Sequence, residues 1–194
     1  LTVMIFTKTK IEGAYLLDIK QIKDERGFFG RSFCQTEFEQ HGLNPKVVQV
    51  NVSSNFKKGT LRGLHMQVKP AEESKLVRCT KGAIFDVLVD LRPQSSTFMQ
   101  WFGVELTAES FQMLYVPEGC AHGYLTLVDE TDVMYQVSEF YTPAAERGFQ
   151  WNDPAFAITW PVEPQVISQK DQTQPLFNLE EWLAANSAPV LPVH

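Results

Sequence analysis

The sequence predicts an all-β protein, an antiparallel sandwich or barrel with a few short helices. Short segments in which apolar and polar residues alternate recur along the chain, and turn signals at 57–59, 81–82 and 117–119 separate them at close spacing. The 194 residues are 44% hydrophobic and 21% charged, which suits one domain with a substantial core. No internal repeat or low-complexity segment interrupts the pattern, so we expect one domain over residues 1–194.

The clearest expected strand covers residues 46–53, where valines alternate with Gln49, Asn51 and Ser53. A strand face of amides, in place of lysines and glutamates, either lines a cavity or faces solvent, and this strand alone does not decide between the two. Further strands are expected at 60–67, 83–91, 101–106, 112–116, 123–128 and 132–137.

Helical signals are confined to two short segments. Residues 36–42 form the first and end at Gly42, a residue favoured at helix C-termini. Residues 178–186 form the second, with Asn178 as the N-cap. Residues 154–164 and 168–171 are expected to be loops, and about the last 15 residues to form a loose tail.

Charge and cysteine content limit the classes of partner. A net charge of −6 argues against nucleic-acid binding, although a few arginines in one cleft still suit an anionic small ligand. Cys34, Cys79 and Cys120 have no CxxC spacing, which fits a reducing compartment, and we expect a cytoplasmic protein. The sequence has no signal-peptide layout and no run of about 18 apolar residues, so no membrane partner is expected.

Metal and cofactor motifs are absent from the sequence. The four histidines stand at 41, 65, 122 and 194, with neither an HxH nor an HExxH spacing, so we expect no metal. No GxGxxG, P-loop or GxSxG motif occurs, which argues against a dinucleotide cofactor, a Walker-type site and a serine hydrolase.

The expected strand at 60–67 contains two ionisable side chains, Arg62 and His65. A buried charge is costly unless it is paired, so these residues are either satisfied structural groups or face a ligand pocket. Imidazole exchanges protons near neutral pH, and guanidinium suits bidentate phosphate binding. Strict alternation puts the two side chains on opposite faces, and Gly63 could permit a bulge that redirects one of them.

Three further polar candidates each have an ordinary structural explanation. His122 follows a turn and is more often a turn-capping residue, and Lys75 at a strand start is usually solvated. Asp171 lies in the polar segment at 168–171, and a carboxylate is the usual partner that fixes a histidine tautomer.

Aromatic and arginine candidates are equally open. Tyr135 and Tyr141 are most simply core tyrosines, although a tyrosine hydroxyl can protonate a carbanion opposite a histidine base. Arg26 lies beside a glycine turn and two phenylalanines, which suits a phosphate and a planar base, while an arginine at a turn is usually just exposed.

Ten sequence blocks, in one order, resemble the dTDP-4-dehydrorhamnose 3,5-epimerase family over about residues 8–177. The blocks are DERGFF (24–29), QVN (49–51), LRGLH (61–65), KLVR (75–78), FDVLVDLR (85–92), PEGCAHG (117–123), VMY (133–135), ERG (146–148), DPAFAITWP (153–161) and SQKD (168–171). The resemblance implies a cupin-like jelly roll that forms a homodimer, uses no metal or other cofactor and acts on a nucleotide-linked 4-keto-6-deoxy sugar.

The resemblance also implies roles for individual residues. His65 matches the catalytic base, Asp171 its carboxylate partner, Tyr135 the acid on the opposite face and Lys75 the residue near the C4 oxygen. The remaining matches hold the nucleotide diphosphate or the sugar, or lie near the ligand: Arg26, Phe29, Gln49, Asn51, Arg62, His122, Tyr141, Glu146 and Lys170.

The chemistry of the substrate class agrees with these roles. A C4 ketone acidifies the C–H bonds at C3 and C5, and removal of either proton gives an enolate with charge on O4. A cation such as Lys75 stabilises that charge, and inversion needs a base on one face and an acid on the other. The ketone is itself the electron sink, so no cofactor is required.

Three departures from the family pattern leave the substrate open. Gly30 and Arg31 stand where a glutamate is usual, Met66 replaces an aromatic residue, and Glu72 and Glu73 replace an alanine–glutamine pair. The nucleotide (dTDP, CDP, UDP or GDP), the sugar and the inverted carbons therefore stay open. The alternatives are a single-carbon 3- or 5-epimerase on another nucleotide sugar such as a CDP-linked one, a ketoisomerase, or a non-catalytic sugar-nucleotide-binding cupin.

Overall fold

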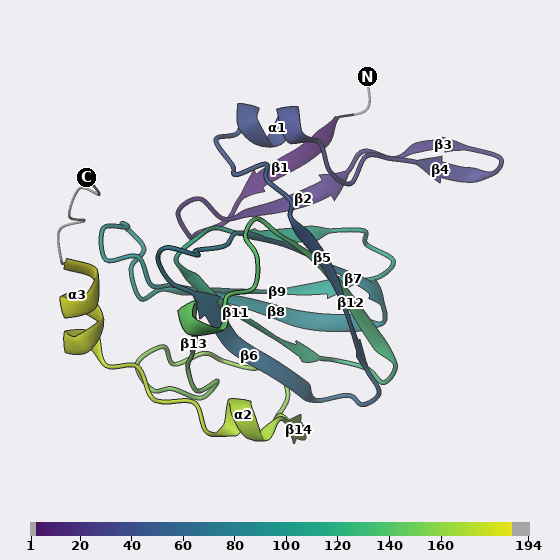
Figure 1. Cartoon of the computed structure of the whole chain (residues 1–194). Coiled ribbons are helices and arrows are strands. Elements are labelled where there is room, and N and C mark those ends of the chain that lie inside the picture. The colour runs from purple at the N-terminus through teal and green to yellow at the C-terminus, as the bar shows by residue number, and fades with distance from the viewer. Residues whose placement is uncertain (1–2, 188–194) are drawn as a thin grey trace.

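The computed structural model describes residues 3–187, which form two β-sheets packed face to face, with short helices at their margins (Figure 1). The sequence-based prediction of an all-β sandwich is confirmed. In this described range, no helix is both long and apolar enough to cross a membrane.

The first sheet has six antiparallel strands in the order β1-β2-β10-β7-β12-β5. Strands distant in the sequence are therefore neighbours, as in a Greek key. Their bounds are β1 (Met4–Lys8), β2 (Tyr15–Ile19), β5 (Gln49–Asn55), β7 (Lys75–Lys81), β10 (Met113–Val116) and β12 (Thr131–Val137).

The second sheet has the order β13-β6-β11-β8-β9, and β14 pairs in parallel with β6. A separate two-stranded hairpin, β3 with β4, projects away from the body of the molecule (Figure 1). The bounds are β3 (Ile22–Asp24), β4 (Gly27–Phe29), β6 (Thr60–Gln67), β8 (Ala83–Asp90), β9 (Trp101–Thr107), β11 (Cys120–Thr126), β13 (Glu146–Gly148) and β14 (Val166–Ile167).

The helices are α1 (Gln35–Gln40), the 3-10 helix η1 (Pro143–Ala145), α2 (Gln169–Gln172) and α3 (Leu179–Ser187). Both predicted helices are confirmed: Gly42 follows α1 at φ +69°, and the Asn178 side chain accepts a hydrogen bond from the Glu181 backbone N–H. The loop predicted at 168–171 is wrong, because Ser168 caps a short helix by accepting from the backbone N–H of Asp171.

Helix α3 occupies the first part of the segment predicted as a loose tail. The Trp182 ring N–H donates to the Leu91 carbonyl oxygen at 2.7 Å, and its ring packs against Phe149 and Phe177. These contacts fasten the helix to the second sheet. The rest of the predicted tail, residues 188–194, lies outside the described residues.

The interior between the sheets is apolar along most of its length. A cluster of buried apolar side chains fills this interior. Burial contributes on the order of 1.5–3 kcal/mol for each large apolar side chain, so the cluster is a main source of stability. Its members come from both sheets: Val77, Cys79, Leu114 and Val133 from the first, and Ile84, Leu88, Leu106 and Tyr124 from the second. Toward one end the facing side chains become polar, and there the sandwich opens into a cavity.

Gly63 creates a bulge in β6. His65 pairs with His122 of β11, whereas Arg62 pairs with Tyr124, so β6 holds one more residue than β11 between the two pairs. Arg62 and His65 consequently line the same cavity despite their odd separation. The predicted bulge is confirmed.

Only glycine fits at the bulge. Gly63 has φ +109°, and a Cβ there would lie 2.6 Å from the His122 carbonyl oxygen and 2.7 Å from the Gly123 Cα. We therefore expect Gly63→Ala to lower the free energy of unfolding by about 2–4 kcal/mol, because strain adds to the clash. Urea denaturation measures this loss.

Gly42→Ala is the matched control, because Gly42 has φ +69° but open space around the added methyl group. Backbone strain alone should cost about 1 kcal/mol there. Equal losses in the two variants would show that the contact with β11 does not restrict residue 63.

Candidate active site

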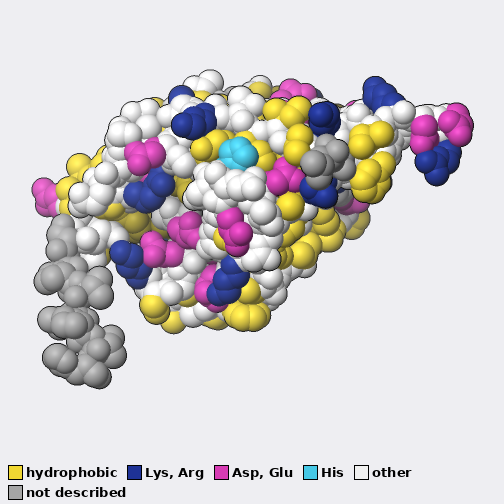
Figure 2. Space-filling model, turned by 90° about the horizontal axis from the view of Figure 1, so that it is seen from above, with side chains coloured by type: hydrophobic (Ala, Val, Ile, Leu, Met, Phe, Trp, Pro, Cys, Tyr) yellow, Lys and Arg dark blue, Asp and Glu magenta, His cyan; other side chains and the backbone are white. Residues whose placement is uncertain are grey.

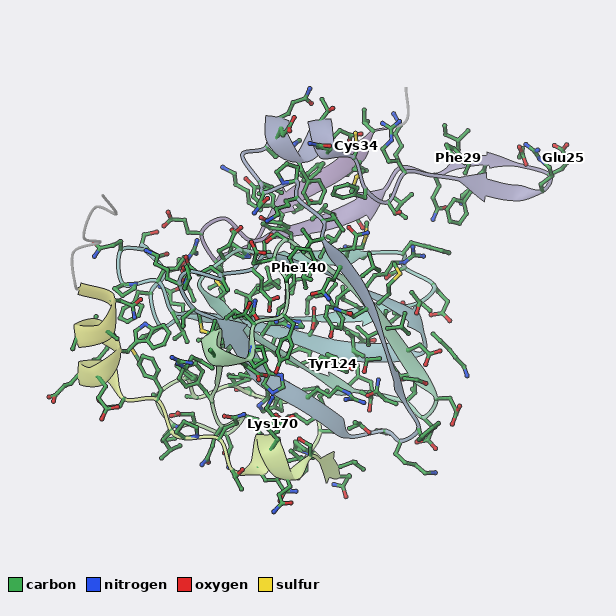
Figure 3. All side chains as sticks on the ribbon, viewed as in Figure 1. Glu25, Phe29, Cys34, Tyr124, Phe140 and Lys170 are labelled. Carbon is green, nitrogen blue, oxygen red and sulfur yellow. The ribbon has the colours of Figure 1, made fainter. Side chains whose placement is uncertain are left out.

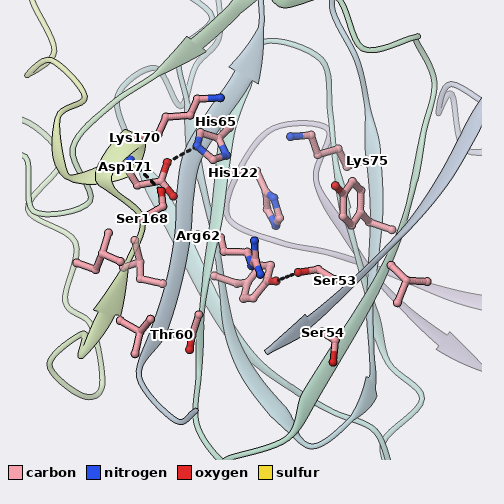
Figure 4. A pocket seen from close by; sticks show the side chains of 16 residues that line it. Ser53, Ser54, Thr60, Arg62, His65, Lys75, His122, Ser168, Lys170 and Asp171 are labelled. Carbon is pink, nitrogen blue, oxygen red and sulfur yellow. Dashed lines mark hydrogen bonds and ion pairs between the residues drawn. The ribbon is translucent and has the colours of Figure 1, made fainter. Parts of the chain in front are cut away.

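A cavity of about 690 Å³ opens between the two sheets, beside α2 (Figure 4). A second cavity of about 380 Å³ shares His65, Lys75 and Tyr135 with it, so we treat the two as lobes of one site. The first sheet supplies one wall through β5, β7 and β12. The second supplies the other through β6 and β11, and α2 closes the side.

The second-sheet wall has a histidine–carboxylate pair. The His65 Nε2 atom lies 2.6 Å from Asp171 Oδ1, while Asp171 Oδ2 accepts the Gly63 backbone N–H at 3.3 Å. Burial alone would raise the pKa of Asp171, but these hydrogen bonds and that of Ser168 hold it below its usual value. An ionised carboxylate only accepts, so Nε2 of His65 carries a proton and Nδ1 is left as the basic nitrogen.

The first-sheet wall carries Tyr135 and Lys75. Val137 of β12 pairs with Lys75 of β7, which makes Lys75 and Tyr135 diagonal neighbours on one face. Burial raises the pKa of Tyr135, and nearby Tyr124 and Glu73 raise it further, so its phenol stays protonated. The Lys75 Nζ lies 3.2 Å from Glu73 Oε1, with only 10% and 12% of the two side chains exposed.

Arg62 and His122 both line the larger lobe, where Arg62 is exposed and His122 is buried. Arg62 Nε donates to the Asn55 amide oxygen at 2.8 Å, and His122 Nε2 lies 2.7 Å from the fully buried Asp86. His122 is therefore a β11 residue in a second histidine–carboxylate pair, and the turn-capping interpretation is wrong.

The smaller lobe is lined by polar side chains at its rim. Glu146 accepts from Lys170 at 2.6 Å and from the Tyr141 hydroxyl at 2.8 Å. Gln49 and Asn51 of β5 also line this lobe, and the next polar residue of that strand, Ser53, lines the larger one. The amide face of β5 thus faces the site, and the cavity interpretation of the sequence pattern is confirmed.

Two predicted ligand residues do not reach the cavity of their own chain. Arg26 and Phe29 lie on the projecting hairpin, where Phe29 is 69% exposed and Arg26 pairs with Asp24. Figure 3 shows Phe29 far from Tyr124 and Lys170, and in Figure 2 the hairpin extends from the body with charged side chains at its tip. The other predicted site residues all line one lobe or the other.

Several residues of the site were not predicted from the sequence. Asp86 and Asn55 hold His122 and Arg62, the Tyr124 hydroxyl bonds Ser53 at 2.8 Å, and Glu73 faces Lys75. Asp86 in an apolar strand was the one available signal, because a buried carboxylate needs a partner.

The prediction that no metal is used stays a prediction. Among residues 3–187, no group of three or more His, Cys, Asp or Glu side chains is arranged to hold a metal ion. The two histidines of the site are each bonded to a single carboxylate.

Comparison with known proteins identifies relatives over most of the chain. The family model for dTDP-4-dehydrorhamnose 3,5-epimerase matches residues 8–179. The enzyme of that name from Shigella flexneri is 46% identical over 165 residues, which cover 84% of this chain and 91% of the relative.

Solved structures give the same result. The dTDP-4-dehydrorhamnose 3,5-epimerase from Bacillus anthracis, with TDP and PPi bound, has a TM-score of 0.86 and 43% identity, covering 90% of this chain and all of that one. The dTDP-6-deoxy-D-glucose-3,5-epimerase from Legionella pneumophila, in complex with dTDP-4-keto-L-rhamnose, has a TM-score of 0.85 and 38% identity, covering 93% and 97%.

A family match over most of the sequence, the same cupin-like fold and a histidine–carboxylate pair across a cavity from a half-buried tyrosine all agree, and the chain belongs to the dTDP-4-dehydrorhamnose 3,5-epimerase family.

Proposed function

We propose that this protein inverts C3, C5 or both of a nucleotide-linked 4-keto-6-deoxyhexose, with dTDP as the nucleotide. One observation supports this above the others. His65 with its ionised partner Asp171 stands on one sheet, and the protonated phenol of Tyr135 stands on the other, across a single cavity. Inversion at carbon requires a base and an acid on opposite faces of the sugar.

The reaction starts with removal of a proton by His65. The C–H bond at C3 or C5 breaks, its electron pair forms the enolate double bond, and the carbonyl π electrons move to O4. The Lys75 ammonium faces that oxygen and stabilises its charge. Asp171 holds the His65 ring and stabilises the imidazolium that forms.

Tyr135 completes the inversion. The enolate collapses to the ketone while its carbon takes the phenol proton from the opposite face, so the configuration is reversed. The phenolate and the imidazolium then exchange protons with solvent, which restores the starting protonation. No redox step occurs, because the electron pair only moves between carbon and O4.

Cations account for binding of the nucleotide diphosphate. Arg62 and Lys170 line the larger lobe, and guanidinium suits bidentate contact with phosphate. Arg26 and Phe29 would add a phosphate contact and an aromatic surface for the base.

The substrate and the inverted carbons can be read from solvent deuterium uptake by mass spectrometry. We expect incorporation into the dTDP-linked 4-keto-6-deoxyhexose, and little into the CDP-, UDP- and GDP-linked sugars. Two deuterons indicate inversion at C3 and C5, and one indicates a single-carbon epimerase. Binding without any uptake would contradict the proposal and favour a non-catalytic sugar-nucleotide-binding protein.

His65→Ala should reduce deuterium exchange by about 10²–10⁴-fold, the usual contribution of a general base. The affinity for dTDP should change by less than about twofold, because the nucleotide contacts lie elsewhere in the cavity. His41→Ala is the control, since His41 stacks on Phe6 outside both lobes and should retain the wild-type rate. Unimpaired exchange in His65→Ala would remove its role as the base.

We also propose that two chains form a homodimer in which each hairpin serves the partner's cavity. The hairpin carries Arg26 and Phe29 away from their own cavity, which leaves that site without them. The edge strand β5 exposes Val50 and Val52, by 54% and 71%, as an apolar surface for a second copy.

Light scattering of the purified protein should give the mass of a dimer. Arg26→Ala should raise KM about tenfold or more, because a charged phosphate contact is lost. Lys23→Ala, on the same hairpin, is the control and should leave KM unchanged. Mixing the Arg26→Ala and His65→Ala proteins should restore activity, because one mixed site then has an intact base and an intact hairpin. A monomer, or no recovery on mixing, would contradict the arrangement.

We infer a cytoplasmic location from the state of the cysteines. Cys34, Cys79 and Cys120 are unpaired in the described range, which supports the proposal of a reducing cytoplasm.

A further inference from the structure

We propose that Glu73 is a positioning residue that holds the Lys75 ammonium beside the Tyr135 phenol, on the first-sheet wall of the site. The inference rests on the proposed function. One carboxylate therefore places the cation for O4 next to the proton donor.

The position of Glu73 beside Lys75 is the first observation that supports this inference. It lies in the loop between β6 and β7 and lines the smaller lobe with His65, Lys75 and Tyr135. Its Oε1 atom is 3.2 Å from Lys75 Nζ, and each side chain is about nine-tenths buried. Removing one partner of such a buried ion pair strongly destabilises the protein, because the other charge is left unpaired. Glu73 and Lys75 therefore hold each other in place.

The pair still leaves Lys75 able to act. An ammonium has three N–H donors, and the ion pair with the single Glu73 oxygen at 3.2 Å leaves donors for an oxygen of the sugar. Glu73 restricts the flexible lysine side chain to one side of the cavity. That restriction lowers the entropy lost when Lys75 meets O4.

The effect of the Glu73 charge on Tyr135 is the second observation that supports it. Burial is the largest cause of the raised pKa of Tyr135, and the negative charges of ionised Tyr124 and of Glu73 add to it, while Arg62 opposes them. Removing the Glu73 charge should lower that pKa, so the phenol would lose its proton at a lower pH. The other titratable groups that line the two lobes are His65, Lys75, His122, Tyr141, Glu146, Lys170 and Asp171.

The adjacent residue provides a matched control. Glu72 carries the same charge one position earlier, but it lines neither lobe. Burial raises its pKa, and its charged neighbours are Lys69 and Glu118, outside the site. Glu72→Gln therefore changes the net charge as Glu73→Gln does, and it leaves the first-sheet wall with Lys75 and Tyr135 intact.

The test compares pH profiles of deuterium exchange. In Glu73→Gln the alkaline limb of kcat/KM should move to lower pH, because the Glu73 charge is one of the causes that raise the pKa of Tyr135. Near neutral pH, kcat should fall more than KM rises, because the lost interaction acts on the enolate. Glu72→Gln should match the wild type, and Glu73→Asp should recover most of the alkaline limb.

A readout without substrate separates this inference from the proposed function. Ultraviolet absorbance of tyrosinate, with the Tyr135→Phe titration subtracted, reports Tyr135 alone. We expect it to titrate at lower pH in Glu73→Gln than in the wild type. If the wild type exchanges no keto sugar, the proposed function fails and this titration still decides the role of Glu73 in Tyr135 ionisation.

An unpaired Lys75 could prevent Glu73→Gln from folding. The double variant Lys75→Met with Glu73→Gln avoids this, because it leaves neither partner of the ion pair as an unpaired charge. Lys75→Met, which keeps the Glu73 charge, is its reference. The tyrosine should titrate at lower pH in the double variant than in Lys75→Met. Identical titrations, or an equal shift in Glu72→Gln, would overturn the proposal.

Discussion

The bond between His65 and Asp171 is the constraint on which the site depends. Asp171 belongs to α2, more than one hundred residues after β6, and its two carboxylate oxygens bind the His65 ring and the Gly63 backbone N–H. The same residue thus orients the His65 ring and satisfies the backbone N–H at the bulge that turns this ring into the cavity. Burying this carboxylate costs free energy, and the hydrogen bonds offset that cost and hold its pKa low.

The closed end and the open end of the sandwich show how one fold serves stability and chemistry. At the closed end, Leu88, Leu106 and Leu114 fill the space between the sheets without exposure to solvent. At the open end, residues of the same strands and their neighbours turn hydroxyl, amide and imidazole groups inward. Ser53 bonds Tyr124, Asn55 bonds Arg62 and His122 bonds Asp86, and these pairings matter because an unpaired polar group in this environment would cost about 1–3 kcal/mol.

Local patterns predicted much of this structure. Period-two alternation located most central strands, and the amides of β5 indicated the cavity wall, while Gly63 indicated the bulge. Strands β1 and β2 were missed, because residues such as Lys8 and Asp18 break up their apolar pattern. The pairing of Asp171 with His65 required the family resemblance, since no local pattern reports a contact across such a separation.

The hydrogen-bond and ion-pair partners of the polar residues were harder to predict than the strands on which these residues lie. His122 and Lys75 resembled a turn-capping histidine and a solvated lysine, yet both are buried beside carboxylates. Sequence gives no measure of burial for a single residue at the edge of a strand. The location of Arg26 and Phe29 was unpredictable for another reason, because no local pattern reports that the hairpin carrying them projects from the body of the molecule.

Charge balance within the cavity gives these pairings a functional meaning. Lys75, Lys170 and His122 each face a carboxylate, whereas Arg62 bonds the neutral amide of Asn55. A diphosphate entering the larger lobe therefore meets Arg62 as a cation whose charge is not already offset by its hydrogen-bond partner. In the proposed mechanism the ion pair of Lys75 has another consequence: Glu73 balances Lys75 until an enolate oxygen develops charge, and only then does the ammonium gain a second anionic partner. The pairing of each cation therefore bears on whether it would act mainly on the bound ligand or on the transition state.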